Sequence, residues 1–265
     1  MKVRGDERGI RTTEVVFDII ETIKRQNGAR LVDITDEVDR SKSTIYTHLV
    51  SLVNLGYVRN DEGTYQLDLP FLDLGTYTRT TYDIFPTAKP KLNRLAAVTN
   101  ERVQLMVESN GRGVYLYRAE GRRAIPAEVR PGTPRFLHLS SAGKAILAHL
   151  SRDRVDEIVD QWGLPTKTNH TVVDREILSA ELEDIRHNGY AINRQESIQG
   201  AWSVGVAINR DNEVLGALSL SAPIHRVRDG DQVRDDVLQA VLATADEIEI
   251  ETNLAGEDGQ SHRTH

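Results

Sequence analysis

Hydrogen-bonding side chains of moderate length gather in one short stretch near the N-terminus. The stretch opens at Ser41 and continues with Lys42, Ser43, Thr44, Tyr46, Thr47 and His48. On the outer face of a helix, such side chains can reach base edges and phosphates in the major groove of DNA. With Arg40 just before it and Arg59 on the hairpin that follows, the stretch predicts a recognition helix. The alternative is the solvated face of a helical docking module.

A second group of small polar residues lies in the C-terminal half. Ser140 and Ser141 stand at the start of an expected helix, so we expect unpaired amides at Ala142 and Gly143, which would form a small anion site. Ser219 and Ser221 alternate with leucines, so both hydroxyls lie on one face of a strand. Together these groups predict a site for a small oxygen-rich acid. Alternatively, the serines satisfy local backbone groups and the glycine only turns the chain.

Motifs for catalysis and metal binding are weak or absent in the sequence. Gly143-Lys144 departs from a phosphate-binding P-loop, because Ala145 replaces the required Ser or Thr and His138 the first Gly. The side chain of Lys144 is expected either to lie along the surface of its own helix or to form an ion pair with a carboxylate. No G-x-S-x-G or H-E-x-x-H pattern occurs, so we expect no enzyme, no cofactor and no metal. A metal held by Asp and scattered histidines stays open: His138, His170 or His225.

The composition is that of a soluble globular chain with no cysteine. Its 265 residues carry a net charge of −7 and predict about two domains. The acidity lies in the C-terminal part, since residues 1–59 carry ten basic and nine acidic residues, a balance of +1. No apolar stretch approaches the roughly 20 residues that span a bilayer, and the first residues lack the apolar core of a secretory signal. We therefore expect a cytoplasmic protein without a membrane anchor.

The N-terminal elements that position the polar stretch read as three helices and a hairpin. Thr12 or Thr13 caps the first helix, Gly28 ends it, and a short second helix follows. Ser41 caps the third helix, whose buried stripe is Ile45, Leu49, Leu52 and Val53. Residues 57–67 then predict two strands around a turn at 60–63, a wing beside the third helix.

The rest of the chain alternates helices and strands. A connecting helix over 71–85 leads to further helices over 91–98, 141–150, 155–162, 174–188 and 231–250. Strands are expected over 103–107, 114–117, 190–193, 204–208 and 214–221. The polar residues after 250 are expected to fray.

Two sets of residues, in the right order, resemble the IclR family of transcriptional regulators over about residues 10–250. The first set is Ser41-Lys42-Ser43-Thr44-Ile45 with Leu55-Gly56-Tyr57-Val58. The second is Ser141-Ala142-Gly143-Lys144-Ala145-Ile146-Leu147-Ala148, Gly189-Tyr190, Glu196, Gly200 and Leu215-Gly216-Ala217-Leu218-Ser219-Leu220-Ser221. The family often has two acidic residues in place of Gln195-Glu196 and Ala-Pro-Ile in place of residues 206–208. Effector identity is therefore not carried over.

The resemblance implies an α+β protein in four parts. These are a winged helix-turn-helix over 10–69, a linker helix over 70–85, a GAF-like effector-binding domain over 86–252 and a flexible tail over 253–265. Family position implies a pocket lined by Ser141, Ala142, Asn193, Ser203, Ser219 and Ser221, to which the residues themselves add Gly143; Trp202 either walls this pocket or belongs to the core.

The implied function is a ligand-responsive repressor or activator, often of carbon-source catabolism. It would bind a palindromic double-stranded DNA operator as a homodimer or homotetramer and respond to a small organic or sugar acid. The competing hypothesis is an enzyme or metabolite-binding module that uses its helix-turn-helix only for assembly. Whether an N-terminal arm with Arg4, Arg8 and Arg11 enters a minor groove or is disordered stays open.

Overall fold

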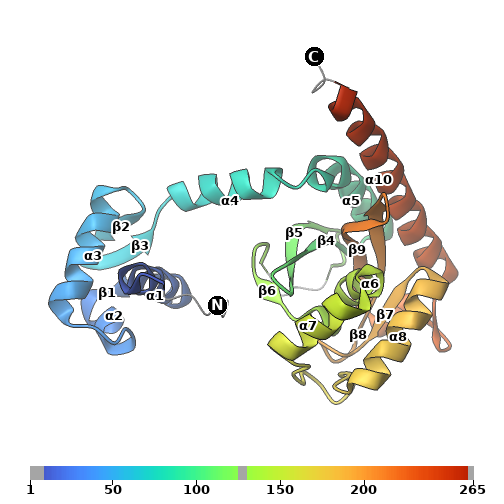
Figure 1. Ribbon diagram of the computed structural model, residues 1–265, viewed down its shortest axis with the longest axis horizontal. Coiled ribbons are helices and arrows are strands. Elements are labelled where there is room, and N and C mark those ends of the chain that lie inside the picture. Colours follow the sequence, from blue (N-terminus) through green and yellow to red (C-terminus); the bar gives the residue numbers. More distant parts are fainter. Residues whose placement is uncertain (1–8, 125–129, 262–265) are drawn as a thin grey trace. The chain divides into compact units, whose positions relative to one another are not determined.

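The computed structural model describes residues 9–124 and 130–261 (Figure 1). The chain divides into two compact units, one ending at Thr81 and one beginning at Tyr82. Arg4 and Arg8 of the expected arm lie outside the described residues, and Arg11 begins the first helix.

The first unit contains the predicted three helices and hairpin. Its elements are α1 (Arg11–Gln26), β1 (Ala29–Arg30), α2 (Leu31–Glu37), α3 (Lys42–Asn54), β2 (Val58–Asp61), β3 (Thr64–Leu67) and α4 (Pro70–Thr80). The strands form an antiparallel sheet in the order β1-β3-β2. Ile19, Ile34, Ile45 and Leu49 are fully buried at the centre of the core that joins the helices to this sheet.

Two expectations about the ends of α1 are wrong. The helix begins at Arg11, with Ile10 at its N-cap and no side-chain cap, so Thr12 and Thr13 are exposed positions inside it. It ends at Gln26, with Asn27 as its C-cap in the left-handed conformation at φ 56°; Gly28 follows, also with a positive φ, of 109°. Asn tolerates this conformation because its short polar side chain can bond locally.

The expected linker helix over 70–85 is interrupted. α4 ends at Thr80, and α5 (Ile84–Thr99) begins after three intervening residues. The reason is tertiary: Ile84 and Phe85 are buried in the core of the second unit, whereas α4 buries none of its residues.

The second unit is built on a six-stranded antiparallel sheet in the order β6-β5-β4-β9-β8-β7. The strands are β4 (Arg102–Ser109), β5 (Arg112–Glu120), β6 (Pro134–Arg135), β7 (Ala191–Arg194), β8 (Ala201–Arg210) and β9 (Glu213–Pro223). The predicted β8–β9 hairpin pairs Val204 with Leu220 and Ala207 with Ala217. Short elements follow it: α9 (Ile224–Val227), β10 (Arg228–Asp229) and β11 (Gln232–Val233).

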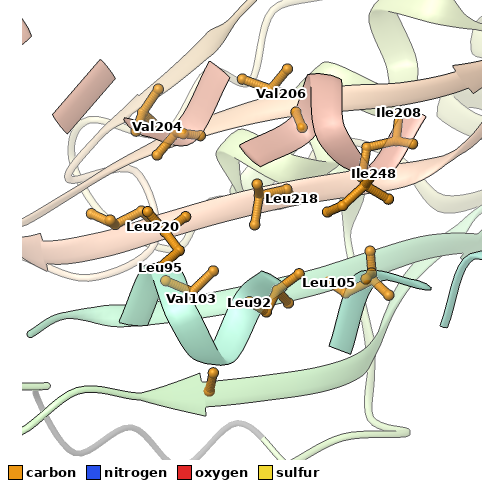
Figure 2. Close-up of a cluster of buried hydrophobic side chains, with 14 of the residues drawn as sticks. Leu92, Leu95, Val103, Leu105, Val204, Val206, Ile208, Leu218, Leu220 and Ile248 are labelled. Carbon is orange, nitrogen blue, oxygen red and sulfur yellow. The ribbon is translucent and has the colours of Figure 1, made fainter. Parts of the chain in front are cut away.

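Helices cover both faces of this sheet. One face carries α5 and α10 (Asp235–Ser261), and Figure 2 shows Leu92, Leu95 and Ile248 of these helices among Val103, Leu105, Leu218 and Leu220 of the strands. The other face carries the 3-10 turn η1 (Leu137–Leu139), α6 (Ser141–His149), α7 (Arg152–Trp162) and α8 (Arg175–Asn188). Asp174 caps α8 through its carboxylate and Gly189 ends it in the left-handed conformation, as the sequence predicts.

The last helix continues beyond the predicted end. α10 runs to Ser261, through the segment expected to be a flexible tail. Thr252 is buried and its hydroxyl donates to the carbonyl of Ile248, so packing still holds the helix after Ile250.

Candidate functional site

The exposed face of α3 carries the predicted recognition residues. Ser41 caps the helix, because its Oγ accepts a hydrogen bond of 3.2 Å from the amide of Thr44. Ile45 and Leu49 are fully buried and fix the helix against the core. Lys42, Ser43, Tyr46 and Thr47 are therefore held on the outer face, with Thr44 and His48 half-buried beside them. The helix contains no carboxylate, so nothing on it opposes the approach of phosphates.

Several of these side chains already have partners within the unit. The hydroxyl of Thr44 lies 2.8 Å from that of Ser41, and Thr47 Oγ1 donates to the carbonyl of Ser43 at 2.9 Å. In the wing, the exposed Arg59 donates its Nε to Gln66 Oε1 at 3.0 Å. Half-buried Arg40 donates to the carbonyl of Asp39. The bonded partner of Arg59 is a neutral amide, and no carboxylate among the described residues pairs with its guanidinium.

A polar patch occupies one end of the sheet face that α6 covers. The register aligns Arg102 of β4 with Ser221 of β9, and Ser221 with Ser203 of β8. Two residues along, Gln104 pairs with Ser219. Side chains two apart on a strand share a face, so the predicted pair Ser219 and Ser221 faces the same way as Arg102.

This patch forms the floor of a cavity. Its empty space, counted out to the open mouth, is about 560 Å³. The lining includes four of the predicted effector residues: Ser141, Ser203, Ser219 and Ser221. It also includes residues that sequence reasoning missed: Arg102, Gln104, Tyr115, Arg135 and the loop residues Ser197 and Ile198.

Arg102 has two buried nitrogens without a hydrogen-bond partner. The side chain is 6% exposed, and neither Nε nor one of the terminal nitrogens donates to any acceptor in the described residues. Glu120 is the nearest carboxylate, 3.8 Å from Nε. Burial, and next the charge of Arg118, lower the pKa of Arg102. The hydroxyl of Ser221 across the strand pair is likewise buried without a partner. Unpaired donors of this kind are costly, and an acceptor in the cavity would satisfy them.

The three other predicted effector residues do not line this cavity. The amide of Gly143 was expected to be free but donates to Ser140 Oγ at 3.0 Å, an ordinary helix cap. The amide of Ala142 faces β8, where a Cβ added to Gly205 would lie 2.6 Å from it. Asn193 is buried and donates to the carbonyl of Leu139 at 2.8 Å. The expected amide anion site is therefore wrong, because the first turn of α6 packs on the sheet.

Trp202 belongs to the core. Ser203 faces the cavity, so its neighbour on the strand faces the opposite side of the sheet. Trp202 is 5% exposed among the residues packed against α5 and α10. Of the two interpretations, the core one is confirmed.

Lys144 meets carboxylates, one of the two expected outcomes. It is fully buried, with its Nζ 2.8 Å from both oxygens of Glu196 and 2.5 Å from Glu181 Oε1. Burial raises the pKa of Glu196, and the ammonium of Lys144 opposes that rise. Asn193 Oδ1 accepts from the amide of Glu196 at 3.1 Å. This network holds the loop that carries Ser197 and Ile198 in the cavity wall.

The histidines give no metal site in the described part of the chain, where no three His, Asp or Glu side chains come together as ligands. His138 is buried, with its Nε2 3.2 Å from the carbonyl of Pro165. Burial lowers its pKa. Within residues 9–124 and 130–261, no helix is both long and apolar enough to cross a membrane.

Comparison with known proteins matches both halves of the chain. Residues 12–62 match the family described as IclR helix-turn-helix domain, and residues 77–250 match bacterial transcriptional regulator IclR C-terminal. The probable HTH-type transcriptional regulator ArcR of Halobacterium salinarum is 34% identical over 76% of this chain and 78% of its own length.

Solved structures of the same fold cover nearly the whole chain. The crystal structure of the Thermotoga maritima IclR is 25% identical, with a TM-score of 0.75 over 92% of this chain and 97% of that one. An IclR homolog from Microbacterium hydrocarbonoxydans, crystallised with 4-hydroxybenzoate, is 22% identical, with a TM-score of 0.80 over 92% and 99%. The expected fold, a helix-turn-helix followed by an α/β domain, is confirmed.

Proposed function

The chain belongs to the IclR family of DNA-binding transcriptional regulators, and from this premise we propose that it is an acid-responsive regulator of a carbon-source catabolic pathway. It binds a palindromic operator through α3 and its wing, and a small organic or sugar acid in the cavity of the second unit. The observation that carries the proposal is the buried guanidinium of Arg102 in that cavity, two of whose nitrogens have no hydrogen-bond partner among the described residues.

DNA contact is assigned to the exposed face of α3, together with Arg40 and Arg59. The contact residues on α3 and its cap are Ser41, Lys42, Ser43, Thr44, Tyr46, Thr47 and His48. Lys42 and Arg59 supply phosphate contacts, and the exposed hydroxyls and Tyr46 reach base edges. The absence of any carboxylate on α3 supports this assignment.

A homodimer, or a tetramer of two dimers, would match a palindromic operator. The support is the surface of α4, which buries none of its own residues and exposes Leu72 (66%), Leu74 (47%) and Tyr77 (69%). A second copy of the chain would cover these side chains. Effector state then reaches the DNA as a coupling between two separate sites.

In the cavity, a carboxylate would accept hydrogen bonds from Arg102 and from Ser221. Two parallel bonds from one guanidinium match the two oxygens of a carboxylate. Further oxygens of the ligand would bind to Ser203, Ser219 and Gln104. Ser141 lies beside them, and its hydroxyl donates to that of Ser203 at 2.8 Å. The binding of 4-hydroxybenzoate by a protein of the same fold supports an acid as the ligand class.

The effector part is tested by calorimetric titration of the full-length protein with a panel of small acids. Arg102→Gln should weaken the best acid at least tenfold, because the charge-assisted bonds are lost. Arg122→Gln, an exposed arginine on the loop after β5, is the matched control and should bind normally. Equal affinity in both variants would remove Arg102 from the site.

The DNA part is tested by Lys42→Ala on an operator fragment. Loss of one phosphate contact should weaken binding at every sequence and reduce the slope of log K against log salt by about 1. Arg175→Ala, an exposed cation of the second unit, is the control. An unchanged affinity and slope for Lys42→Ala would exclude Lys42 from the contacts.

A further inference from the structure

A groove lies beside the effector cavity and shares part of its wall. Arg135, Phe136 and Leu139 line both spaces, and the groove adds Arg112, Lys167 and two prolines. Its empty space is about 490 Å³, counted to the open surface. The two spaces therefore meet at Arg135, on β6.

Among the described residues, three cations and no carboxylate line the groove. Arg112, Arg135 and Lys167 line it, and within the described residues none of the three forms an ion pair. Uncompensated positive charge of this kind raises the local concentration of anions. Arg154 of the same unit, by contrast, forms ion pairs with Glu108 and Glu157.

Arg112 is fixed in place before any ligand binds. Its guanidinium lies 3.9 Å from the ring centre of Phe136 and 4.7 Å from that of Trp162. Its Nε donates to the carbonyl of Arg135 at 3.1 Å. Burial, and next the charge of Arg135, lower the pKa of Arg112. A rigid guanidinium beside a second cation is preorganised for an anion.

We propose that this groove is a second anion subsite of the effector site, so that the effector is an elongated dicarboxylic acid. This rests on the proposed function: one carboxylate binds Arg102 and Ser221 inside the cavity, and the other binds Arg135 and Lys167 at the groove. Tyr115 and Phe136 contact the chain between the two carboxylates. The subsite determines specificity, because a monoacid leaves the groove cations without a partner.

The register of the sheet limits how short such an acid can be. Arg135 pairs with Gly113, which in turn pairs with Glu108. Glu108 lies six residues along β4 from Arg102, about 20 Å in an extended strand. The long side chains of Arg102 and Arg135 reach into this gap from its two ends, since both line one cavity. Carboxylates separated by a single carbon are too close to use both subsites.

The test is a calorimetric ladder on the full-length protein: malonate, succinate, adipate, pimelate and suberate, with hexanoate and octanoate as matched monoacids. We expect affinity to rise along the diacids and the best diacid to bind at least tenfold more tightly than the monoacid of equal length. A parallel titration with 6-phosphonohexanoate distinguishes a carboxylate from a phosphonate at the groove. Tighter binding of the phosphonate would overturn the assignment of a second carboxylate.

Lys167→Gln should reduce the preference for the diacid while leaving monoacid affinity within twofold, because Lys167 lines the groove and not the cavity. Arg135→Gln, which lines both spaces, should weaken the diacid more than the monoacid. Arg122→Gln is again the control. Equal affinity for diacid and monoacid in the wild type, or equal loss of both in the two variants, overturns the subsite. If monoacids bind through Arg102 and diacids are no better, the subsite fails and the proposed function stands. If no acid binds and Arg102→Gln changes nothing, the effector part of the proposed function fails.

Discussion

The substitution Lys144→Met removes the cation that is paired with the buried carboxylate of Glu196. Among the described residues, no other cation forms an ion pair with Glu196. The ammonium lies 2.8 Å from both oxygens of Glu196, whose side chain is 5% exposed. Breaking a buried ion pair by removing one partner costs about 3–5 kcal/mol, because a charge is left buried and unpaired. We expect a loss of unfolding free energy of that size. Removing both charges in Lys144→Met/Glu196→Leu should cost less than Lys144→Met alone.

The size of the loss should depend on pH. Burial raises the pKa of Glu196 in the folded protein, and Lys144 opposes the rise, so the pKa is higher still in the variant. A carboxyl with a raised folded pKa contributes stability below its unfolded pKa of about 4.3 and loses it as pH rises. The deficit of the variant should therefore be smaller at pH 5 than at pH 8.

Urea unfolding followed by tryptophan fluorescence measures this directly. The chain has two tryptophans, Trp162 and Trp202, and both belong to the second unit, so the signal reports that unit. Lys89→Met, a lysine of α5 on the opposite face of the sheet, is the matched control. A deficit below about 1 kcal/mol, or one that does not change between pH 5 and pH 8, would refute the reasoning, since a buried unpaired carboxylate must show both effects.

Three further predictions concern a cap, a close packing contact and a buried histidine. Ser41→Ala should lower the stability of the first unit by about 1 kcal/mol in thermal unfolding, since the amide of Thr44 loses its acceptor; no change would mean that water replaces the cap. Gly205→Ala should destabilise the second unit by about 1–3 kcal/mol or more, because the new Cβ lies 2.5 Å from the carbonyl carbon of Ser141; wild-type stability would show that α6 can shift away. Burial lowers the pKa of His138, so its contribution is present above its unfolded pKa of about 6.5 and is lost as pH falls below it. His138→Gln should flatten that part of the stability curve, and an unchanged curve would contradict this source of the pH dependence.

Local signals predict the elements that carry the two sites. Ser41 and Asp174 cap their helices, and Gly189 ends α8, because capping depends on residues within one turn of each other. The alternation of Ser219 and Ser221 with leucines places both on the cavity face, since strand periodicity is also local.

Long-range contacts account for what the sequence analysis missed. Arg102 reaches the cavity through its pairing with Ser221, more than a hundred residues later, and no local pattern contains that register. The amide of Gly143 donates to Ser140 Oγ. This is the alternative in which the serines satisfy local backbone groups. The break between α4 and α5 follows from burial of Ile84 and Phe85 in a core formed by distant strands.

The central claim is that DNA binding by the first unit responds to a small acid bound in the second. It is tested by fluorescence anisotropy of the full-length protein on duplexes from upstream of its own and neighbouring genes, in a salt series, with and without each acid. The account predicts specific, salt-sensitive binding whose affinity changes with one acid in wild type and not in Arg102→Gln. Binding with no preference over random duplex, or with an acid response that persists in Arg102→Gln, would contradict it.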